Sequence, residues 1–402
     1  MTDPVLDFTP VAGIRIGTAA AGIKYANRED LVVIEMAPAS SCAAVFTKNA
    51  FCAAPVTVAK EHQAAASPRY MLINSGNANA GTGQDGINVC NTTCTALAAE
   101  VGCRADEILP FSTGVIGESL PLDKITVALP VAVSGLDENG WPDAAAAIMT
   151  TDTVPKLVSR SFAANGNSII VTGMAKGSGM IRPDMATMLA YVATDADVEP
   201  ALLQECLEQA VAPSFNSITV DGDTSTNDAC VLMASGAGSA PIISERDTAY
   251  TALCETVSEV CMELARAIVK DGEGATKLVE ILVEGAVDID EARKVAYTIA
   301  HSPLVKTALF ASDPNWGRIL AAVGRAGVDQ LDIEAIRIWM GDVCIVRDGG
   351  RAPDYTEQAG QTVMDQDELA IRVELKRGSV GTRVLTCDLS YDYVKINAEY
   401  RT

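Results

Sequence analysis

The stretch Lys176-Gly177-Ser178-Gly179-Met180-Ile181-Arg182-Pro183-Asp184-Met185-Ala186-Thr187-Met188-Leu189 decides how the rest of the chain is interpreted. Its first half is a glycine-broken loop with one lysine, and Pro183 restrains the residue before it to extended geometry. Its second half presents one hydroxyl, on Thr187, directly after the small residue Ala186. A cut between these two residues would make Thr187 a new N-terminus, whose free α-amino group can accept the hydroxyl proton near neutral pH.

A structural interpretation of the same stretch competes with this catalytic one. Residues 185–192 are mostly apolar, and such a run is typical of a buried strand or helix in which a threonine only packs. The stretch by itself favours this second interpretation, because short motifs often match by chance. The remainder of the chain has to decide between the two.

Length, composition and charge restrict the function classes. The 402 residues are enough for two or three domains with a large core, and 49% hydrophobic residues with 20% charged ones are typical of a globular protein. The formal net charge is −22, and the sequence contains no basic tract. We therefore expect no binding to nucleic acid or to an anionic membrane surface.

The sequence also lacks targeting and membrane-spanning patterns. No basic start followed by an apolar run is present near Met1, so we expect no signal peptide. No run of about 18 apolar residues predicts a transmembrane helix. The eleven cysteines include no Cys-x-x-Cys pair, which favours reduced thiols and a cytoplasmic protein.

Metal binding and histidine-based catalysis are both disfavoured. The chain has two histidines, His62 and His301, which excludes a zinc site built on several histidines. The polar run Asp221–Ser225 resembles the start of a calcium loop, but its glycine is at the second position instead of the sixth. We expect no metal, and we expect the base in any acyl chemistry to be a group other than histidine.

Apolar patterns predict an α/β chain. Apolar runs bounded by turn signals predict strands at residues 31–36 and 70–74. Apolar side chains with a helical period predict helices at residues 88–101 and 200–211. We expect Asn88 to cap the first of these helices.

Two glycine-containing turns have compositions suited to catalysis. Thr113-Gly114 follows an apolar run, and such a turn can direct a backbone N–H and a threonine O–H at one point, as an oxyanion hole requires. Glu273 stands between two glycines, where the backbone can approach a ligand closely. Either turn alone would be unremarkable.

Seven sequence blocks, in order, resemble one family: the ornithine acetyltransferases, which are glutamate N-acetyltransferases of arginine biosynthesis. The resemblance extends from about residue 10 to the C-terminus. Any single block is weak, but seven in the same order are specific. They are residues 74–80, 112–117, 176–189, 214–228, 271–277, 313–319 and 396–402.

The resemblance implies a fold and a domain organisation. It implies layered sheets flanked by helices, similar to the N-terminal-nucleophile fold, with a smaller C-terminal α/β domain. We expect a catalytic region at residues 1–280 and a C-terminal domain at residues 281–402 that completes the substrate pocket. Family members cut themselves at the Ala-Thr bond, here Ala186-Thr187. This cut would give chains of residues 1–186 and 187–402, usually assembled as α2β2.

The resemblance also implies the site. Thr187 corresponds to the nucleophile, and Thr113 and Gly114 to the oxyanion hole. The family's substrate-binding residues correspond to Thr153, Lys176, Thr187, Glu273, Asn397 and Thr402. The transfer of Thr153 is the least secure, because two further threonines precede it in Thr150-Thr151-Asp152-Thr153.

The expected reaction moves an acetyl group from N2-acetyl-L-ornithine to L-glutamate through an acetyl-Thr187 intermediate. We expect no cofactor, and the sequence leaves open whether acetyl-CoA is a second acetyl donor. One alternative is a related amidohydrolase or aminopeptidase, in which water takes the acyl group. Another is an unprocessed binding protein that keeps the fold.

Overall fold

The computed structural model describes residues 7–164, 166–182, 188–239 and 242–399. The chain divides into two compact units. Unit 1 comprises Met1–Gly177, Arg182–Asn216 and Thr224–Ile268, and unit 2 comprises Ser178–Ile181, Ser217–Asp223 and Val269–Thr402. Two short segments from the first part of the sequence therefore belong to unit 2. The boundary at residue 280 stays a prediction about folding domains, since these units are defined by spatial contact alone.

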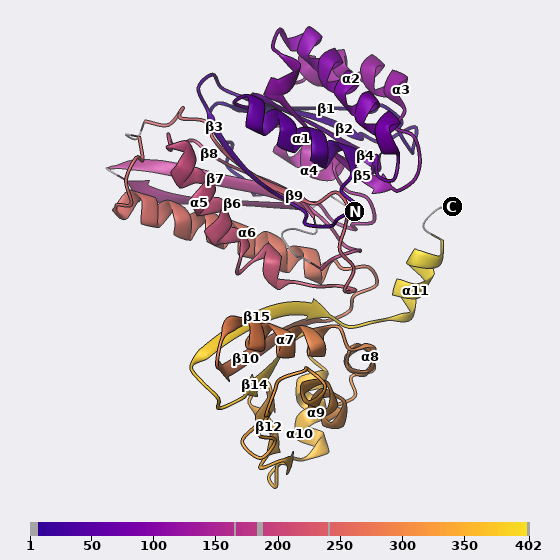
Figure 1. Ribbon diagram of the computed structural model, residues 1–402, viewed down its shortest axis with the longest axis vertical. Helices are drawn as coiled ribbons and strands as arrows, with labels where there is room; N and C mark the ends of the chain where they lie inside the picture. Colours follow the sequence, from indigo (N-terminus) through magenta and orange to yellow (C-terminus); the bar gives the residue numbers. More distant parts are fainter. Residues whose placement is uncertain (1–6, 165, 183–187, 240–241, 400–402) are drawn as a thin grey trace. The chain divides into compact units, whose positions relative to one another are not determined.

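The first sheet of unit 1 has the strand order β1-β2-β4-β5 (Figure 1). β2 runs antiparallel to both β1 and β4, whereas β4 and β5 are parallel. The strands are β1 (Ile14–Ala19), β2 (Leu31–Met36), β4 (Tyr70–Asn77) and β5 (Ile108–Val115). The helices in this part are α1 (Ala54–Ala65), α2 (Gly83–Val101), α3 (Leu122–Ser134) and α4 (Trp141–Ala147), with a short 3₁₀ turn at Ala105–Glu107.

The second sheet of unit 1 has the order β3-β9-β8-β7-β6, in which only β8 and β9 run parallel. Its strands are β3 (Ser41–Phe46), β6 (Lys156–Ala164), β7 (Asn167–Lys176), β8 (Leu189–Thr194) and β9 (Ala229–Ala234). The accompanying helices are α5 (Pro200–Val211) and α6 (Thr248–Lys270), and a 3₁₀ turn lies at Phe215–Ser217.

The two sheets of unit 1 pack face to face. One buried cluster contains side chains from both, including Ile34 and Phe111 of the first sheet and Tyr191 and Val231 of the second. The rings of Phe111 and Tyr191 meet edge to face, with centroids 5.3 Å apart. Helices α2 and α3 cover the outer face of the first sheet, and α5 and α6 lie on the other side of the second (Figure 1). Unit 1 therefore has four layers.

Unit 2 contains one six-stranded sheet with the order β13-β12-β11-β14-β10-β15. Its strands are β10 (Leu278–Ala286), β11 (Arg337–Met340), β12 (Val343–Arg347), β13 (Gly350–Arg351), β14 (Glu368–Glu374) and β15 (Val380–Cys387). Its helices are α7 (Ile289–Ala300), α8 (Pro303–Phe310), α9 (Trp316–Gly324), α10 (Glu357–Met364) and α11 (Tyr391–Ala398). A separate buried cluster, which includes Ile281, Val295 and Ile338, forms its core.

These layers of sheets and helices confirm the predicted α/β fold class. The strand predicted at residues 31–36 and the helix predicted at residues 200–211 have the bounds of β2 and α5. The predicted start of the first long helix is wrong. α2 begins at Gly83 with Thr82 as its N-cap residue, so Asn88 lies inside the helix and does not cap it.

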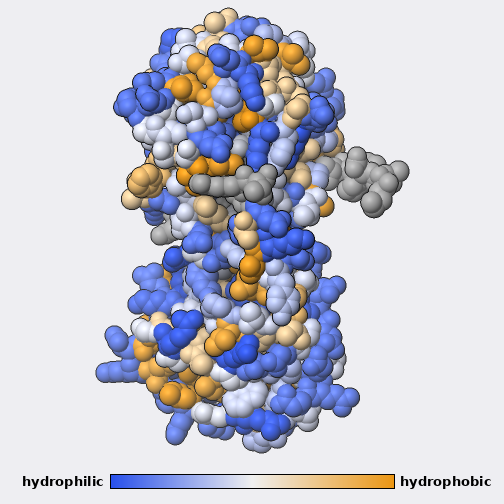
Figure 2. Space-filling view, turned by 90° about the vertical axis from the view of Figure 1, so that its right-hand side faces the viewer, coloured by the Kyte–Doolittle hydropathy of each residue, from blue (hydrophilic) through white to orange (hydrophobic). Residues whose placement is uncertain are grey.

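Surface and helix composition give two further observations. Figure 2 shows hydrophilic and hydrophobic residues interspersed over the face that it draws. Exposed large apolar side chains include Val127 and Val131 on α3 and Tyr391 and Val394 on α11. Among the helices in the described part of the chain, none combines the length and apolar composition needed to span a bilayer.

Candidate active site

The predicted turn at Thr113-Gly114 is wrong, because both residues lie inside β5 close to its end. The backbone of the strand there nevertheless favours glycine. Gly114 has φ +133°, a conformation that side chains rarely adopt. It also pairs with Gly76 of β4, and a Cβ on Gly114 would lie 2.2 Å from the Gly76 carbonyl carbon. The neighbouring Thr113 is 9% exposed. The backbone thus fixes where the Thr113 hydroxyl is placed.

Lys176 joins this end of β5 to the second sheet of unit 1. It is the last residue of β7, and only 9% of it is exposed. Its Nζ donates hydrogen bonds to the Thr113 hydroxyl at 3.2 Å and to the Thr150 hydroxyl at 3.0 Å. The structure therefore brings two of the predicted site residues, Thr113 and Lys176, into direct contact.

A buried ion pair lies beside Lys176. The Nζ of Lys156, at the start of β6, is 2.7 Å from Oδ1 of Asp152, and the two side chains are 1% and 0% exposed. Burial opposes ionisation of Asp152, but the charges of Lys176 and Lys156 and the Gly177 N–H outweigh it. Together they lower the pKa of Asp152 to about 2, so the group is a carboxylate at neutral pH.

The polar segment before β9 reaches the same region of unit 1. The Asn227 side-chain amide donates to the carbonyl oxygens of Ala78, at 2.6 Å, and of Ser112, at 2.9 Å. Asp228 is 3% exposed, and its Oδ2 accepts no hydrogen bond from any residue that the structure describes. Burial raises the pKa of Asp228 well above 3.8, although a Ser225 hydrogen bond and the charge of Lys176 oppose this.

Strand register relates this region to the predicted cleavage bond. Lys176 of β7 pairs with Leu189 of β8, and Leu189 pairs with Ala229 of β9. The predicted nucleophile Thr187, the cleavage bond Ala186-Thr187 and the predicted binding residue Thr402 lie outside the described residues.

Two other predicted residues meet in unit 2. The Asn397 side-chain amide, on α11, donates to Oε2 of Glu273 at 2.7 Å. Glu273 is 8% exposed, and its backbone N–H donates to the Ser178 carbonyl at 2.8 Å. A Cβ on Gly179 would lie 2.4 Å from the Glu273 carboxyl group, so only glycine leaves this side chain where it is. The Glu273 carboxylate is therefore held by α11 and confined by the 178–181 segment.

The predicted site residues fall into two groups within the described chain. Thr113, Gly114 and Lys176 are together in unit 1, and Glu273 and Asn397 are together in unit 2. Thr153 is exposed. Within the run of residues 150–153, Thr150 accepts a hydrogen bond from Lys176.

Sequence reasoning missed Asp152 and Lys156 as site neighbours. The only signal was the hydroxyl-rich run Thr150-Thr151-Asp152-Thr153, which does not show that its carboxylate is buried against a lysine four residues later.

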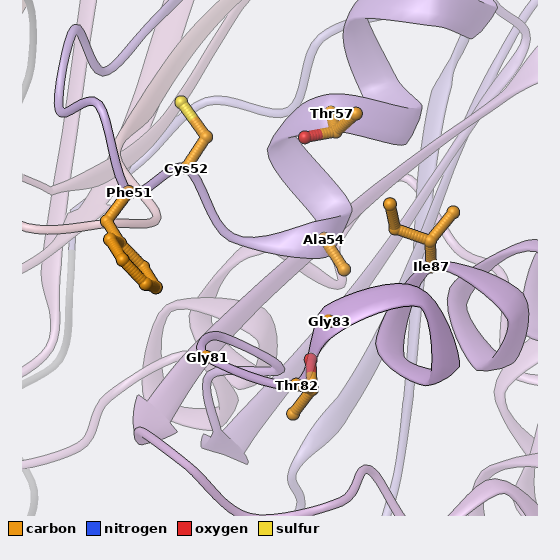
Figure 3. A pocket seen from close by; sticks show the side chains of 8 residues that line it. All are labelled: Phe51, Cys52, Ala54, Thr57, Gly81, Thr82, Gly83 and Ile87. Atoms are coloured by element: carbon orange, nitrogen blue, oxygen red, sulfur yellow. The ribbon is translucent and has the colours of Figure 1, made fainter.

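A cavity of about 350 Å³ lies elsewhere in unit 1, between the starts of α1 and α2 (Figure 3). Among the described residues that line it, none is a predicted site residue. The lining residues are Phe51, Cys52, Ala54, Thr57, Gly81, Thr82, Gly83 and Ile87. Within residues 7–164, 166–182, 188–239 and 242–399, no group of three or more His, Cys, Asp or Glu side chains is arranged to hold a metal ion.

Comparison with known families and proteins identifies the lineage of the chain. Residues 15–402 match the ArgJ family. The chain belongs to the ArgJ family. The arginine biosynthesis bifunctional protein ArgJ of Methylococcus capsulatus is 62% identical over 393 residues, with 98% of this chain and 96% of that protein covered. The protein of the same name from Pseudomonas fluorescens is 54% identical over 400 residues, with 99% and 98% covered.

Two solved structures match parts of this chain. The arginine biosynthesis bifunctional protein ArgJ of Bacillus halodurans is 39% identical, covers 52% of this chain and 97% of its own, and has a TM-score of 0.49. The ornithine acetyltransferase of Mycobacterium tuberculosis, solved in complex with ornithine, is 35% identical. It covers 44% of this chain and 94% of its own, with a TM-score of 0.39.

Proposed function

We propose that this ArgJ-family chain transfers the acetyl group of N2-acetyl-L-ornithine to L-glutamate, a step of L-arginine biosynthesis. The observation that carries the proposal is the contact between Lys176 and Thr113 near the end of β5, in a chain that matches the family over residues 15–402. A buried ammonium in contact with a hydroxyl can help to stabilise negative charge on a carbonyl oxygen.

In this proposal the chain first cuts itself between Ala186 and Thr187. The Thr187 hydroxyl attacks the Ala186 carbonyl, the peptide bond breaks as its nitrogen takes a proton, and water hydrolyses the resulting ester. The products are residues 1–186 and a chain that begins with Thr187. The released α-amine then serves as the base that the two histidines do not provide.

Acetyl transfer follows in two half-reactions. Thr187 Oγ attacks the acetyl carbon of N-acetylornithine and its own amine takes the hydroxyl proton. The carbon–nitrogen bond breaks, and ornithine leaves with that proton. Glutamate then attacks acetyl-Thr187 through its amine, the Thr187 amine passes the proton that glutamate loses to Thr187 Oγ as the ester bond breaks, and N-acetylglutamate leaves. Thr113 and Gly114 donate to the negative oxygen in both halves, and such donors are worth roughly 3–4 kcal/mol each in other acyl-transfer sites.

The remaining predicted residues are assigned to substrate recognition. Glu273, steadied by Asn397, is the partner that we assign to the ornithine ammonium. Lys176 is assigned to a substrate carboxylate or to polarisation of the acetyl group. Thr153 and Thr402 complete the proposed set of binding residues.

Further parts of the proposal concern donors, assembly and location. The relatives are named as bifunctional proteins, which supports acetyl-CoA as a second acetyl donor and glutamate as its acceptor. The cycle needs no other cofactor. We also propose an α2β2 assembly of the two products in the cytoplasm.

The test is a transfer assay on the purified protein with a matched pair of variants. The wild-type chain should convert N-acetylornithine and glutamate to ornithine and N-acetylglutamate. Thr187→Ala should abolish both cleavage and transfer, whereas Thr187→Ser keeps a hydroxyl and should retain part of both. Measurable transfer by Thr187→Ala would contradict the mechanism. Ornithine release at the same rate without glutamate would favour the amidohydrolase alternative.

A further inference from the structure

The buried Asp152–Lys156 pair is the strongest unassigned arrangement of charges near the proposed chemistry. Both side chains are removed from solvent, and the Lys156 ammonium also approaches the Val154 carbonyl at 3.3 Å. A buried ion pair is poor evidence for stability, because desolvation offsets most of the attraction. The role of the pair is therefore better judged from its contacts with neighbouring residues.

Asp152 accepts hydrogen bonds from two backbone N–H groups near Lys176. Its Oδ1 accepts from the Gly177 N–H at 2.7 Å, and Gly177 directly follows Lys176. Its Oδ2 accepts from the Thr150 N–H at 3.1 Å, and the Thr150 hydroxyl is one of the two that Lys176 contacts. One carboxylate thus orders the residue after Lys176 and one of its hydrogen-bond partners.

Asp152 also carries a negative charge close to Lys176. Lys176 favours the charged form of Asp152, and the same attraction acts in return on the lysine. Asp228 also senses the charge of Lys176, but burial disfavours its carboxylate form. Lys156 also pairs with Asp152, and its positive charge offsets part of the attraction between Asp152 and Lys176.

We propose that Asp152 is a positioning residue for the acetyl transfer, which holds Lys176 charged and in place, and that Lys156 weakens its electrostatic effect. Neither side chain touches substrate in this scheme. The inference rests on the proposed function, because that function assigns Lys176 to the reaction. The pair acts through its backbone contacts at Gly177 and Thr150 and through its charge. Thr187 remains the residue that carries the acetyl group.

The two members of the pair should act in opposite directions on the pH profile. Asp152→Asn keeps one of the two acceptor oxygens and removes the negative charge, so Lys176 should lose its proton at lower pH. Lys156→Met removes the positive charge that offsets Asp152, so Lys176 should keep its proton to higher pH. A neighbouring charge commonly shifts the pKa of a group by roughly one unit, and the alkaline limb of the pH–rate profile should move with it.

The experiment measures kcat/KM for ornithine release from N-acetylornithine against pH in the mature protein. We expect the alkaline limb of Asp152→Asn to fall about one unit earlier and that of Lys156→Met to fall later. The double variant removes both charges of the pair and should have an intermediate limb. Glu263→Gln is the matched control, since Glu263 pairs with Arg160 on the surface and should leave the profile unchanged.

The outcomes separate this inference from the proposed function. A wild-type protein without acetyl transfer would overturn the proposed function itself. Wild-type transfer with unchanged limbs in both single variants and in the double variant would overturn the positioning role alone. Shifts of both single variants in the same direction would also overturn it, because they would reflect a shared loss of structure. Thermal unfolding of each variant shows which of them fold.

Discussion

At the scale of single residues, the hydrogen bond from Lys176 orients the Thr113 hydroxyl. Lys176 donates to its oxygen at 3.2 Å, so the hydroxyl hydrogen is left to donate elsewhere. An ammonium on the oxygen also withdraws electron density, which strengthens the O–H as a donor. This arrangement suits a group that has to stabilise an oxyanion.

Thr113→Val removes this donor at nearly constant shape. We predict a fall in kcat of about 10²–10³, the usual effect of losing one oxyanion-hole donor. Thr150→Val is the control, because it removes the other hydroxyl that Lys176 contacts and should reduce kcat much less. The measurement is initial rates of N-acetylglutamate formation. Activity of Thr113→Val within twofold of wild type would exclude the role.

Asp228 provides a second prediction at this scale. Burial raises the pKa of its carboxyl well above 3.8, so the folded protein holds it protonated while the unfolded chain ionises it near pH 4. Its stabilising contribution is therefore complete below that pH and is lost as pH rises through the folded-state pKa.

Asp228→Asn mimics the protonated acid and should remove this loss. We predict that, between pH 5 and the folded-state pKa, the variant loses less stability than the wild type as pH rises. Denaturant unfolding across this range measures the difference. A wild-type protein whose stability relative to Asp228→Asn does not change with pH would show that Asp228 is not held protonated.

At the scale of elements, the close approach of β4 and β5 depends on Gly114. An added Cβ would meet the Gly76 carbonyl carbon at 2.2 Å, and φ +133° is strained for any other residue. Gly114→Ala should lower the free energy of unfolding by at least about 2 kcal/mol, in the range of backbone strain plus a steric clash. Gly117→Ala is a useful comparison, since no atom lies within 4 Å of a Cβ there, which leaves the strain of φ +84° without a clash. Equal stability of the two variants in urea unfolding would contradict the predicted clash.

Several elements could be predicted because local signals and burial agree. β2 is a continuous apolar run with a turn on either side, and α5 begins with Pro200, which favours the first turn of a helix. The start of α2 was predicted too late in the sequence, because glycine at positions 83 and 86 disfavours a helix. A Cβ on Gly86 would lie 1.9 Å from the Thr82 hydroxyl, so close packing with the preceding loop requires glycine there.

The candidate site was only partly predictable, for a related reason. Thr113, Gly114 and Lys176 belong to distinctive motifs, and the structure places Thr113 and Lys176 in contact. The Asp152–Lys156 pair belongs to no motif, and charged residues four apart are normally expected at the surface. Their burial includes a contact with Gly177, which is distant in sequence, so no local pattern records it.

At the scale of the whole molecule, the dominant feature is the formal net charge of −22. Such a charge opposes compaction through self-repulsion, and dissolved salt screens it. We predict that the thermal midpoint rises by roughly 2 °C or more between about 0.01 M and 0.15 M sodium chloride, as the Debye length falls from about 30 Å to about 8 Å. Potassium chloride should have the same effect, because screening depends on ionic strength. A midpoint that falls over this range would contradict the prediction.

Family membership over residues 15–402 leads to one central claim about the whole chain, which is that it matures by cutting itself at Ala186-Thr187. Intact mass spectrometry of the folded, purified protein with N-terminal sequencing tests this claim most directly. The account predicts two masses, corresponding to residues 1–186 and 187–402, with the second chain starting Thr187-Met188-Leu189. A single uncut chain that nevertheless transfers acetyl groups would contradict it.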